Sequence, residues 1–123
     1  MSMAALARPA HVLIQHLFDV IDGQRWDELD EVFAPDCVYY RPGYPTLEGL
    51  PRLEHFYRAE RIIRFGRHQV ENIVSELSVA ACWGRFRGTG KTGEALDEQF
   101  ADTYVVNGGR IVTRKTFFFR PAI

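Results

Sequence analysis

The apolar residues in the first third of the chain recur at helical spacing. Between Ala10 and Ile21 they follow one another at steps of three and four, which predicts an amphipathic helix that Gly23 ends. Apolar residues in Trp26–Phe33 again fall on one side, and Pro35 follows them, so a second, shorter helix is predicted there.

A strand and a third helix are predicted next. Cys37–Arg41 is rich in aromatic and β-branched residues, which favours a strand. The third helix is predicted to start at Gly49 and Pro51 and to end at Gly66. Its apolar residues recur at helical spacing, and two Glu–Arg pairs four residues apart support it.

From His68 onward the pattern changes to the two-residue period of β-strands. Short turns separate the segments, and Asn107-Gly108-Gly109 is a strong hairpin signal. The predicted strands are Gln69–Glu76, Val79–Arg87, Glu98–Val106 and Arg110–Arg120. Helices followed by an antiparallel meander predict an α+β fold, with three helices packed on one face of a curved, mostly antiparallel sheet.

The last predicted strand carries apolar side chains on both of its faces. Phe117, Phe118 and Phe119 are consecutive, and neighbouring residues of a strand point to opposite faces. The outer face of the sheet therefore needs a cover as well as the inner one. We expect a homodimer that forms through the sheet.

Length and composition fit one domain with a substantial core. The chain has 123 residues, 46% hydrophobic and 13% aromatic, so residues 1–123 are predicted to form a single domain, with residues 1–8 flexible. Lys and Arg number 15 and Asp and Glu 16, which gives no global field for nucleic acid or an anionic membrane surface. Small molecules and proteins are the expected partners.

The sequence lacks the signals of export and of membrane insertion. No apolar run of about 18 residues occurs, and Met1–Pro9 lacks the apolar stretch of a signal peptide. Cys37 and Cys82 lie far apart and form no C-x-x-C pair. Reduced thiols and a cytoplasmic location are therefore expected.

Three segments resemble a known family. FDVIDGQRWDELDEVFAPDCVYY, LEGLPRLEHFY and FADTYVVNGGRIVTRKTFFF are similar to the SnoaL-like polyketide cyclases and ketosteroid isomerases of the nuclear-transport-factor-2-like superfamily. The resemblance covers nearly the whole chain and implies a cone-shaped domain with one internal pocket. Because it is a pattern of fold positions rather than one catalytic signature, it implies the architecture more than the reaction.

The resemblance also implies roles for individual residues. Asp102 matches the protonated aspartate with which the isomerases help to stabilise an oxyanion, and Tyr57 matches a pocket tyrosine. His68 and Asn72 match the H-x-x-x-N of the scytalone-dehydratase-like branch, in which the histidine is catalytic. Arg41 stands where the isomerases have their general-base aspartate.

Alternation along the last two strands brings Asp102 and Arg114 to one face. If Val106 lies opposite Arg110 across the hairpin, Asp102 lies opposite Arg114, where a carboxylate and a guanidinium can pair. A paired carboxylate is a poor proton donor, whereas an unpaired one in an apolar cavity can act as an acid. Both a pocket role and a structural ion pair are therefore open for Asp102.

Alternation also groups candidate pocket residues on two earlier strands. His68 and Asn72 share one face, and a histidine that titrates near neutrality could serve there as general acid or base, or could simply be a hydrogen-bonded core residue. Tyr39 and Arg41 share another face, and the family resemblance implies that they line the cone. The predicted catalytic residues are Asp102 and His68, and the predicted substrate-binding residues are Tyr39, Arg41, Tyr57, Asn72 and Arg114.

Four arginines recur every third residue along the predicted third helix. Arg58, Arg61, Arg64 and Arg67 could bind an anionic partner such as an acyl carrier protein, or form an ordinary solvated helix face. The sequence has no histidine and carboxylate spacing typical of a metal site, no phosphate-binding loop and no nucleophile turn, so neither a metal nor a cofactor is predicted.

Two functions of different classes fit these features. The first is a cofactor-independent enzyme that isomerises, cyclises, dehydrates or hydrates a mostly apolar small molecule by acid–base catalysis. The second is a non-catalytic ligand-binding or dimeric scaffold protein on the same fold.

Overall fold

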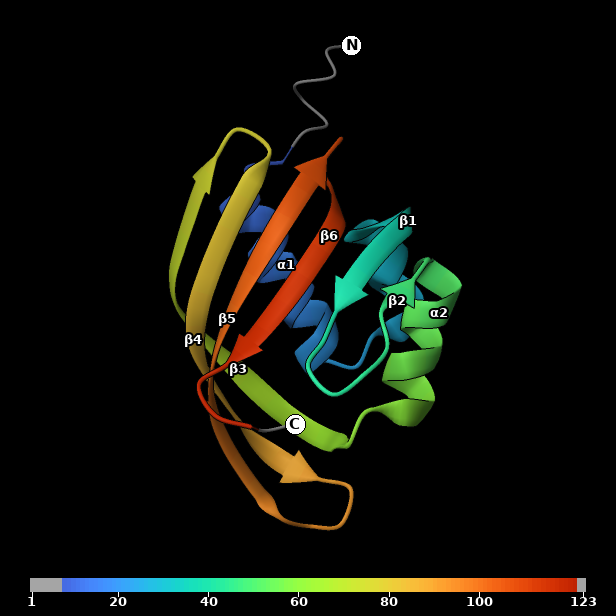
Figure 1. Cartoon of the computed structure of the whole chain (residues 1–123), viewed down its shortest axis with the longest axis vertical. Helices are drawn as coiled ribbons and strands as arrows, with labels where there is room; N and C mark the ends of the chain where they lie inside the picture. Colours follow the sequence, from blue (N-terminus) through green and yellow to red (C-terminus); the bar gives the residue numbers. More distant parts are fainter. Residues whose placement is uncertain (1–7, 122–123) are drawn as a thin grey trace.

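The computed structural model describes residues 8–121, in which helices pack against one curved sheet (Figure 1). In chain order the elements are α1 (Ala10–Asp22), the 3₁₀-helix η2 (Trp26–Glu31), β1 (Phe33–Tyr40), β2 (Leu47–Glu48), α2 (Leu50–His55), the π-helical turn η3 (Phe56–Glu60), β3 (Ile63–Glu76), β4 (Val79–Gly90), β5 (Ala95–Asn107) and β6 (Arg110–Phe118). No helix within these residues is long and apolar enough to span a membrane.

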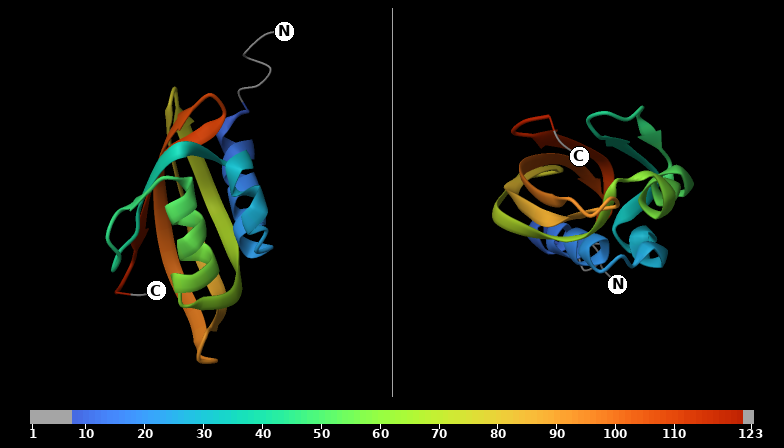
Figure 2. Two further views of the ribbon diagram at one scale, coloured as in Figure 1. Left: turned by 90° about the vertical axis from the view of Figure 1, so that its right-hand side faces the viewer. Right: turned by 90° about the horizontal axis from the view of Figure 1, so that it is seen from below.

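The first helix forms as the apolar pattern predicts. Pro9 precedes its first turn, and the chain turns away at Gly23. Its apolar face is completely buried and packs on β3, so α1 runs along one face of the sheet (Figure 2). This face closes one side of the internal core.

The described chain forms a six-stranded sheet in the order β2-β1-β6-β5-β4-β3. Strands β3 to β6 make an antiparallel meander, as predicted. Strand β1 pairs with β6 in parallel and with the short edge strand β2 in antiparallel fashion. The α+β prediction is thus confirmed, with a sheet that is mixed because the N-terminal strand inserts beside the C-terminal one.

The third helix is shorter than predicted. It ends with η3 at Glu60, and β3 begins at Ile63, so Gly66 lies within a strand and does not end a helix. A Cβ atom at Gly66 would lie 2.2 Å from the ring of Phe86 on β4. Glycine is therefore required here for the close approach of two strands.

Because the third helix ends at Glu60, the four arginines predicted to lie along one helix do not do so. Arg58 lies in η3, whereas Arg64 and Arg67 lie on β3. Arg61 is the extended residue that ends η3, and it is buried. The four side chains do not form a common surface for an acyl carrier protein.

The β5–β6 hairpin differs in register from the prediction. Asn107 lies opposite Arg110 and a bulge follows at Val105 and Val106, so Asp102 lies opposite Thr116 and not Arg114. The difference at Asp102 amounts to two residues, which leaves Asp102, Arg114 and Thr116 on their predicted face. Beyond the bulge the faces are reversed, so that Ile111 is buried although strict alternation would place it outside.

The predicted flexibility of residues 1–8 falls mostly on residues 1–7, which lie outside the described part of the chain. Arg8 is described, and its guanidinium donates to the main-chain oxygens of Glu31 at 2.5 Å and Gly109 at 3.2 Å. It therefore joins the start of α1 to the end of η2 and to the β5–β6 turn.

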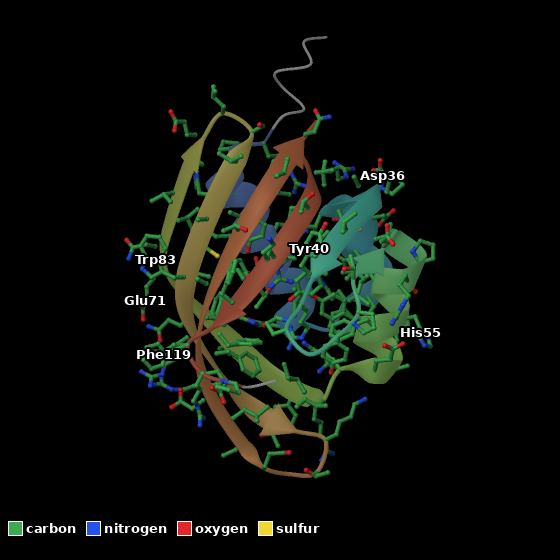
Figure 3. All side chains as sticks on the ribbon, viewed as in Figure 1. Asp36, Tyr40, His55, Glu71, Trp83 and Phe119 are labelled. Carbon is green, nitrogen blue, oxygen red and sulfur yellow. The ribbon has the colours of Figure 1, made fainter. Side chains whose placement is uncertain are left out.

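The outer face of the sheet is apolar and exposed. Trp83 and Phe119 are visible there at the edge of the molecule in Figure 3. Exposed apolar side chains of this face and the adjoining strand ends are Tyr40, Val74, Val79, Trp83, Val105, Phe117 and Phe119. Phe118, in contrast, points inward and lines the internal cavity.

We propose that a second copy of the chain covers this face. A two-fold axis parallel to the strands would lay β3 of one copy over β6 of the other. This arrangement brings Glu76, at one edge of the exposed surface, near Lys115 at the other edge of the second copy. The surface is thus complementary to itself in charge as well as apolar.

Val105→Lys is expected to convert the dimer into a folded monomer, because it places an ammonium group at the centre of the proposed interface. Sedimentation velocity at micromolar concentration measures the change in mass. Val12→Lys is the matched control, since Val12 and Val105 are both 40% exposed but Val12 lies on α1. A wild-type protein that sediments as a monomer would exclude this dimer.

Candidate functional site

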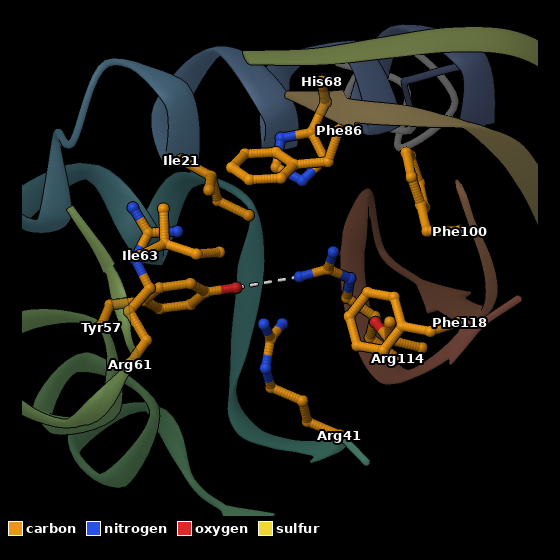
Figure 4. Close-up of a pocket in the computed structure, with 11 residues that line it drawn as sticks. Ile21, Arg41, Tyr57, Arg61, Ile63, His68, Phe86, Phe100, Arg114 and Phe118 are labelled. Carbon is orange, nitrogen blue, oxygen red and sulfur yellow. Dashed lines mark hydrogen bonds between the residues drawn. The ribbon is translucent and has the colours of Figure 1, made fainter. Parts of the chain in front are cut away.

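An internal cavity lies between α1, the η3 turn and the inner face of the sheet (Figure 4). Its lining residues come from both ends of the chain: Ile21, Arg41, Tyr57, Arg61, Ile63, His68, Phe86, Phe100, Arg114, Thr116 and Phe118. The cavity volume is about 20 Å³, which is room for little more than a water molecule. A larger ligand must therefore displace some of the lining side chains.

His68 and Asp22 form a hydrogen-bonded pair at the edge of the cavity. Nδ1 of His68 lies 2.6 Å from one carboxylate oxygen of Asp22, and the backbone N–H of His68 donates to the other oxygen at 2.8 Å. Asp22 is the last residue of α1 and His68 lies on β3, so the packing of helix on strand creates the pair. Two donors from one residue hold the carboxylate in a fixed orientation.

This contact determines which nitrogen of His68 can accept a proton. A carboxylate only accepts hydrogen bonds, so Nδ1 must carry the hydrogen and Nε2 is left with the free lone pair. The imidazole is packed among the rings of Phe18, Phe86 and Phe100, with centroids 4.5, 4.7 and 5.3 Å away. Burial lowers the pKa of His68, and the hydrogen bond that Nδ1 donates to Asp22 opposes that effect.

Asp102 is completely buried and accepts hydrogen bonds on both of its oxygens. One oxygen accepts from the hydroxyl of Thr116 at 2.6 Å. The other accepts from the hydroxyl of Tyr104 at 2.8 Å and from Nη2 and Nε of Arg114 at 2.9 and 3.2 Å. The predicted ion pair is therefore present, although along a diagonal of the hairpin, which a side chain as long as arginine can span.

The role predicted for Asp102 as a catalytic acid does not agree with this geometry. Asp102 is absent from the cavity lining, and every contact it makes is with a donor. A carboxylate whose two oxygens both accept hydrogen bonds holds its donors in place. We therefore assign Asp102 to the positioning of Arg114.

Arg114 connects the hydrogen bonds of Asp102 to the cavity, because its side chain lines the cavity. Its Nη1 donates to the hydroxyl of Tyr57 at 2.9 Å (Figure 4), and its guanidinium lies over the ring of Tyr39 at 4.7 Å. Burial raises the pKa of Tyr57, and the nearby charge of Arg114 acts against that effect. Tyr57 thus keeps its hydrogen and can donate it while its oxygen accepts from Arg114.

Four of the predicted site residues meet in the cavity lining: His68, Arg41, Tyr57 and Arg114. Tyr39 faces inward as predicted but lies behind the lining. Its hydroxyl lies 2.7 Å from that of Thr116 and accepts from Nη1 of Arg41 at 3.1 Å.

Asn72 lies on the other side of the sheet, so its predicted place in the pocket is wrong. The pairing of β3 with β4 shifts between Val70 and Asn72, so that Asn72 pairs with the outward-facing Trp83 and Ile73 takes the inward position. A bulge adds one residue to a strand and therefore reverses the faces of all residues beyond it. Strict alternation along the sequence could not reveal this.

Sequence reasoning missed two residues of the site, Asp22 and Arg61. Asp22 is near Gly23 at the end of a helix, where a solvated carboxylate is the ordinary expectation. Arg61 was placed on a solvated helix face, yet it is 5% exposed and lines the cavity. Arg61 is extended and lies between η3 and β3, so its side chain does not follow the helix face.

A cluster of potential metal ligands also occurs among the described residues, away from the cavity. His16, Glu28 and Glu31 place ligand atoms within 4.8 Å of one another. Arg8 lies 2.6 Å from Nδ1 of the same histidine, and Nε2 lies 3.4 Å from Glu31. Because a guanidinium already contacts this partly exposed cluster, we interpret it as a network of ion pairs.

The chain was compared with known families and proteins. A family model described as SnoaL-like domain matches residues 14–114. The comparison with curated proteins found no match. The family match spans α1 to the middle of β6 and so includes every residue of the cavity lining except Thr116 and Phe118.

Solved structures share the fold at low sequence identity. An NTF2-like protein of unknown function from Burkholderia pseudomallei K96243 is similar with a TM-score of 0.80 and 17% identity, over 96% of this chain and 92% of that one. IdmH, a proposed polyketide cyclase from Streptomyces antibioticus, has a TM-score of 0.76 and 19% identity, over 91% and 93%. An LEH-like epoxide hydrolase from M. tuberculosis has a TM-score of 0.73 and 15% identity, over 86% and 79%. Such identities establish the common fold only.

Asp102→Asn is expected to destabilise the protein by about 3–5 kcal/mol, because it leaves the charge of Arg114 buried without its carboxylate. Denaturant unfolding measures the difference. Asp97→Asn is the matched control on the same strand, since Asp97 pairs with Arg85 in water at the surface. Its unfolding curve should stay nearly unchanged. If Asp102→Asn unfolds like the wild type, the carboxylate does not hold Arg114 as described.

His68 is expected to titrate below the ordinary value of 6.5, in the tautomer with hydrogen on Nδ1. Nitrogen-15 NMR of the imidazole measures both properties. Asp22→Asn should lower the pKa of His68 further, because the carboxylate opposes the effect of burial. Arg114 and Asp102, which also act on the ring, do so in opposite directions.

The same shift predicts the pH dependence of stability. A histidine held neutral in the fold binds a proton in the unfolded chain first, so the free energy of unfolding should fall as the pH drops through about 6.5. His68→Gln should lose less stability over this range than the wild type. A wild-type ring that titrates above 6.5 would contradict both expectations.

Proposed function

Because the chain belongs to the SnoaL-like domain family and has a cavity lined by acid–base groups, we propose that it is a cofactor-independent enzyme that moves a proton on a small organic molecule. The observation that carries this proposal is the Asp22–His68 pair, which leaves Nε2 of a buried, neutral imidazole as the basic atom. The known members of this fold include proteins named as polyketide cyclases and an epoxide hydrolase.

The reaction that fits these groups best is abstraction of a proton from a carbon next to a carbonyl group. Nε2 of His68 takes the proton, and the bonding electrons move into an enolate whose oxygen becomes negative. Tyr57 can donate its hydroxyl hydrogen to that oxygen, while Arg114 behind it supplies positive charge. Return of the proton at another carbon isomerises the substrate, and attack of the enolate carbon on a second carbonyl closes a ring.

Asp22 has a positioning role in this scheme. Its hydrogen bond keeps the hydrogen on Nδ1, so the ring cannot turn or adopt the tautomer that would block Nε2. It also stabilises the imidazolium that forms when His68 takes the proton. Asp102 acts one step further away, because it holds Arg114 and through it Tyr57.

A non-catalytic binding protein is the second candidate. The cavity of about 20 Å³ favours it, because such a volume does not accommodate a polyketide or a steroid without rearrangement. Binding of a ligand without any turnover would be the property that separates it from an enzyme.

The test is hydrogen–deuterium exchange at carbon, followed by proton NMR in D₂O with a panel of small ketones, 1,3-diketones and keto acids. The wild type should exchange the protons next to the carbonyl of at least one compound, and His68→Gln should reduce that rate by about a hundredfold or more. Activity should fall only at a pH below the ordinary histidine value of 6.5, because burial lowers the pKa of His68.

His11→Gln is the matched control for this experiment. His11 is exposed near the start of α1 and does not line the cavity. It should exchange the same compounds at the wild-type rate. Exchange that persists in folded His68→Gln would show that His68 is not the base, and specific binding without exchange would support the binding protein.

A further inference from the structure

Arg61 is a buried cation without a carboxylate partner among residues 8–121. Its side chain is 5% exposed, and within this part of the chain it makes no side-chain hydrogen bond or ion pair. Its guanidinium lies over the rings of Trp26 at 5.0 Å and Tyr57 at 5.5 Å. Those rings are themselves stacked, with centroids 4.9 Å apart. Aromatic faces attract a cation but do not satisfy its N–H donors.

The lining of the cavity is rich in arginine. Three of its lining residues are arginines, Arg41, Arg61 and Arg114, and none of its described lining residues is Asp or Glu. The two carboxylates nearby are already occupied, because the partly buried Asp22 accepts twice from His68 and the buried Asp102 accepts from Arg114 and two hydroxyls. A ligand that brings its own negative charge would supply what the protein lacks.

Arg61 lines the cavity and has no ion pair among residues 8–121, so its guanidinium is available to a ligand that enters there. Arg114 illustrates the contrast, because the protein provides Asp102 for it. The guanidinium fork matches a carboxylate with two parallel hydrogen bonds. The rings of Trp26 and Tyr57 restrict where this guanidinium can lie, because both are in contact with it.

We propose that Arg61 binds the carboxylate of an organic acid, and that this acid is the substrate of the proton transfer proposed above, on which the inference therefore rests. Arg61 and Tyr57 lie on one side of the cavity, and His68 lies with Phe86 and Phe100 on another (Figure 4). An acid anchored at Arg61 would extend past Tyr57 with its reacting carbon towards His68. The preferred substrates are thus keto acids, and simple ketones should be poorer ones.

The experiment is an NMR titration of the full chain with four probes: acetate, benzoate and their neutral amides, acetamide and benzamide. Nε–H of Arg61 should shift in a saturable way with the carboxylates but not with the amides. Arg61→Met should weaken carboxylate binding by about tenfold or more, as loss of a charge-assisted pair requires. Arg52→Met is the control, because Arg52 is an arginine outside the cavity that is already paired with Glu60.

The melting midpoint without any ligand is a second measurement. If Arg61 only stabilised the fold, its replacement would lower this midpoint. Arg61→Met keeps an unbranched chain against the two rings and removes a largely buried charge that has no ion pair in residues 8–121, so its melting midpoint should rise above that of the wild type. If Arg61→Met fails to fold, Arg61→Lys keeps the charge without the fork. That variant should bind the carboxylates more weakly than the wild type.

Three outcomes would overturn the inference: unchanged carboxylate binding in Arg61→Met or Arg61→Lys, equal binding of amides, or stronger binding of inorganic phosphate than of either carboxylate. The wild type failing to bind any carboxylate in a saturable way would do the same. His68→Gln should bind the carboxylates as well as the wild type does. Carboxylate binding that is absent from the wild type, or unchanged in Arg61→Met, thus refutes the role of Arg61 alone, whereas exchange that does not depend on His68 refutes the proposed reaction alone.

Discussion

The ion pair between Asp102 and Arg114 is the contact on which the interior of this protein depends. It joins β5 to β6 within the core, and both side chains are almost completely removed from water. A charge pair in this position contributes to stability only when its remaining hydrogen-bonding groups are also satisfied. Tyr104 and Thr116 donate hydrogen bonds to the Asp102 carboxylate. The Arg114 guanidinium donates one to the hydroxyl of Tyr57. Removal of Asp102, Arg114 or Thr116 therefore takes a hydrogen-bond partner from another buried group.

Not every polar group at the cavity has a hydrogen-bonding partner within the described chain. Asp22 and His68 form a second satisfied pair at its edge, but Arg61 has only aromatic faces around it in the described chain. Groups that are paired within the protein stabilise the fold, whereas Arg61 is the group we propose for a ligand. The protein therefore carries its acid–base group and its candidate anchor on different elements, β3 and the end of η3, which the sheet brings together.

The two faces of the sheet have different chemistry for one physical reason. Successive residues of β4, β5 and β6 alternate between the cavity side, with its charged network, and the outer side, with its exposed aromatic and β-branched residues. A change at Val105 or Trp83 therefore acts on the outer surface, whereas a change at Asp102 acts on the cavity. Self-association and internal chemistry can be altered independently.

The sequence alone determined the α+β class, the first helix, the meander and the face on which Asp102 and Arg114 lie, because these follow from the local periods of apolar residues. The family resemblance added the pocket and pointed to His68 and Tyr57. Tertiary structure decided what depends on distant packing. The bulge in β3 moved Asn72 to the outer face, the close contact of Gly66 with Phe86 shortened the third helix, and the end of α1 brought Asp22 to His68. A bulge, a glycine contact and a helix-to-strand hydrogen bond each depend on residues far away in the chain, so no local pattern records them.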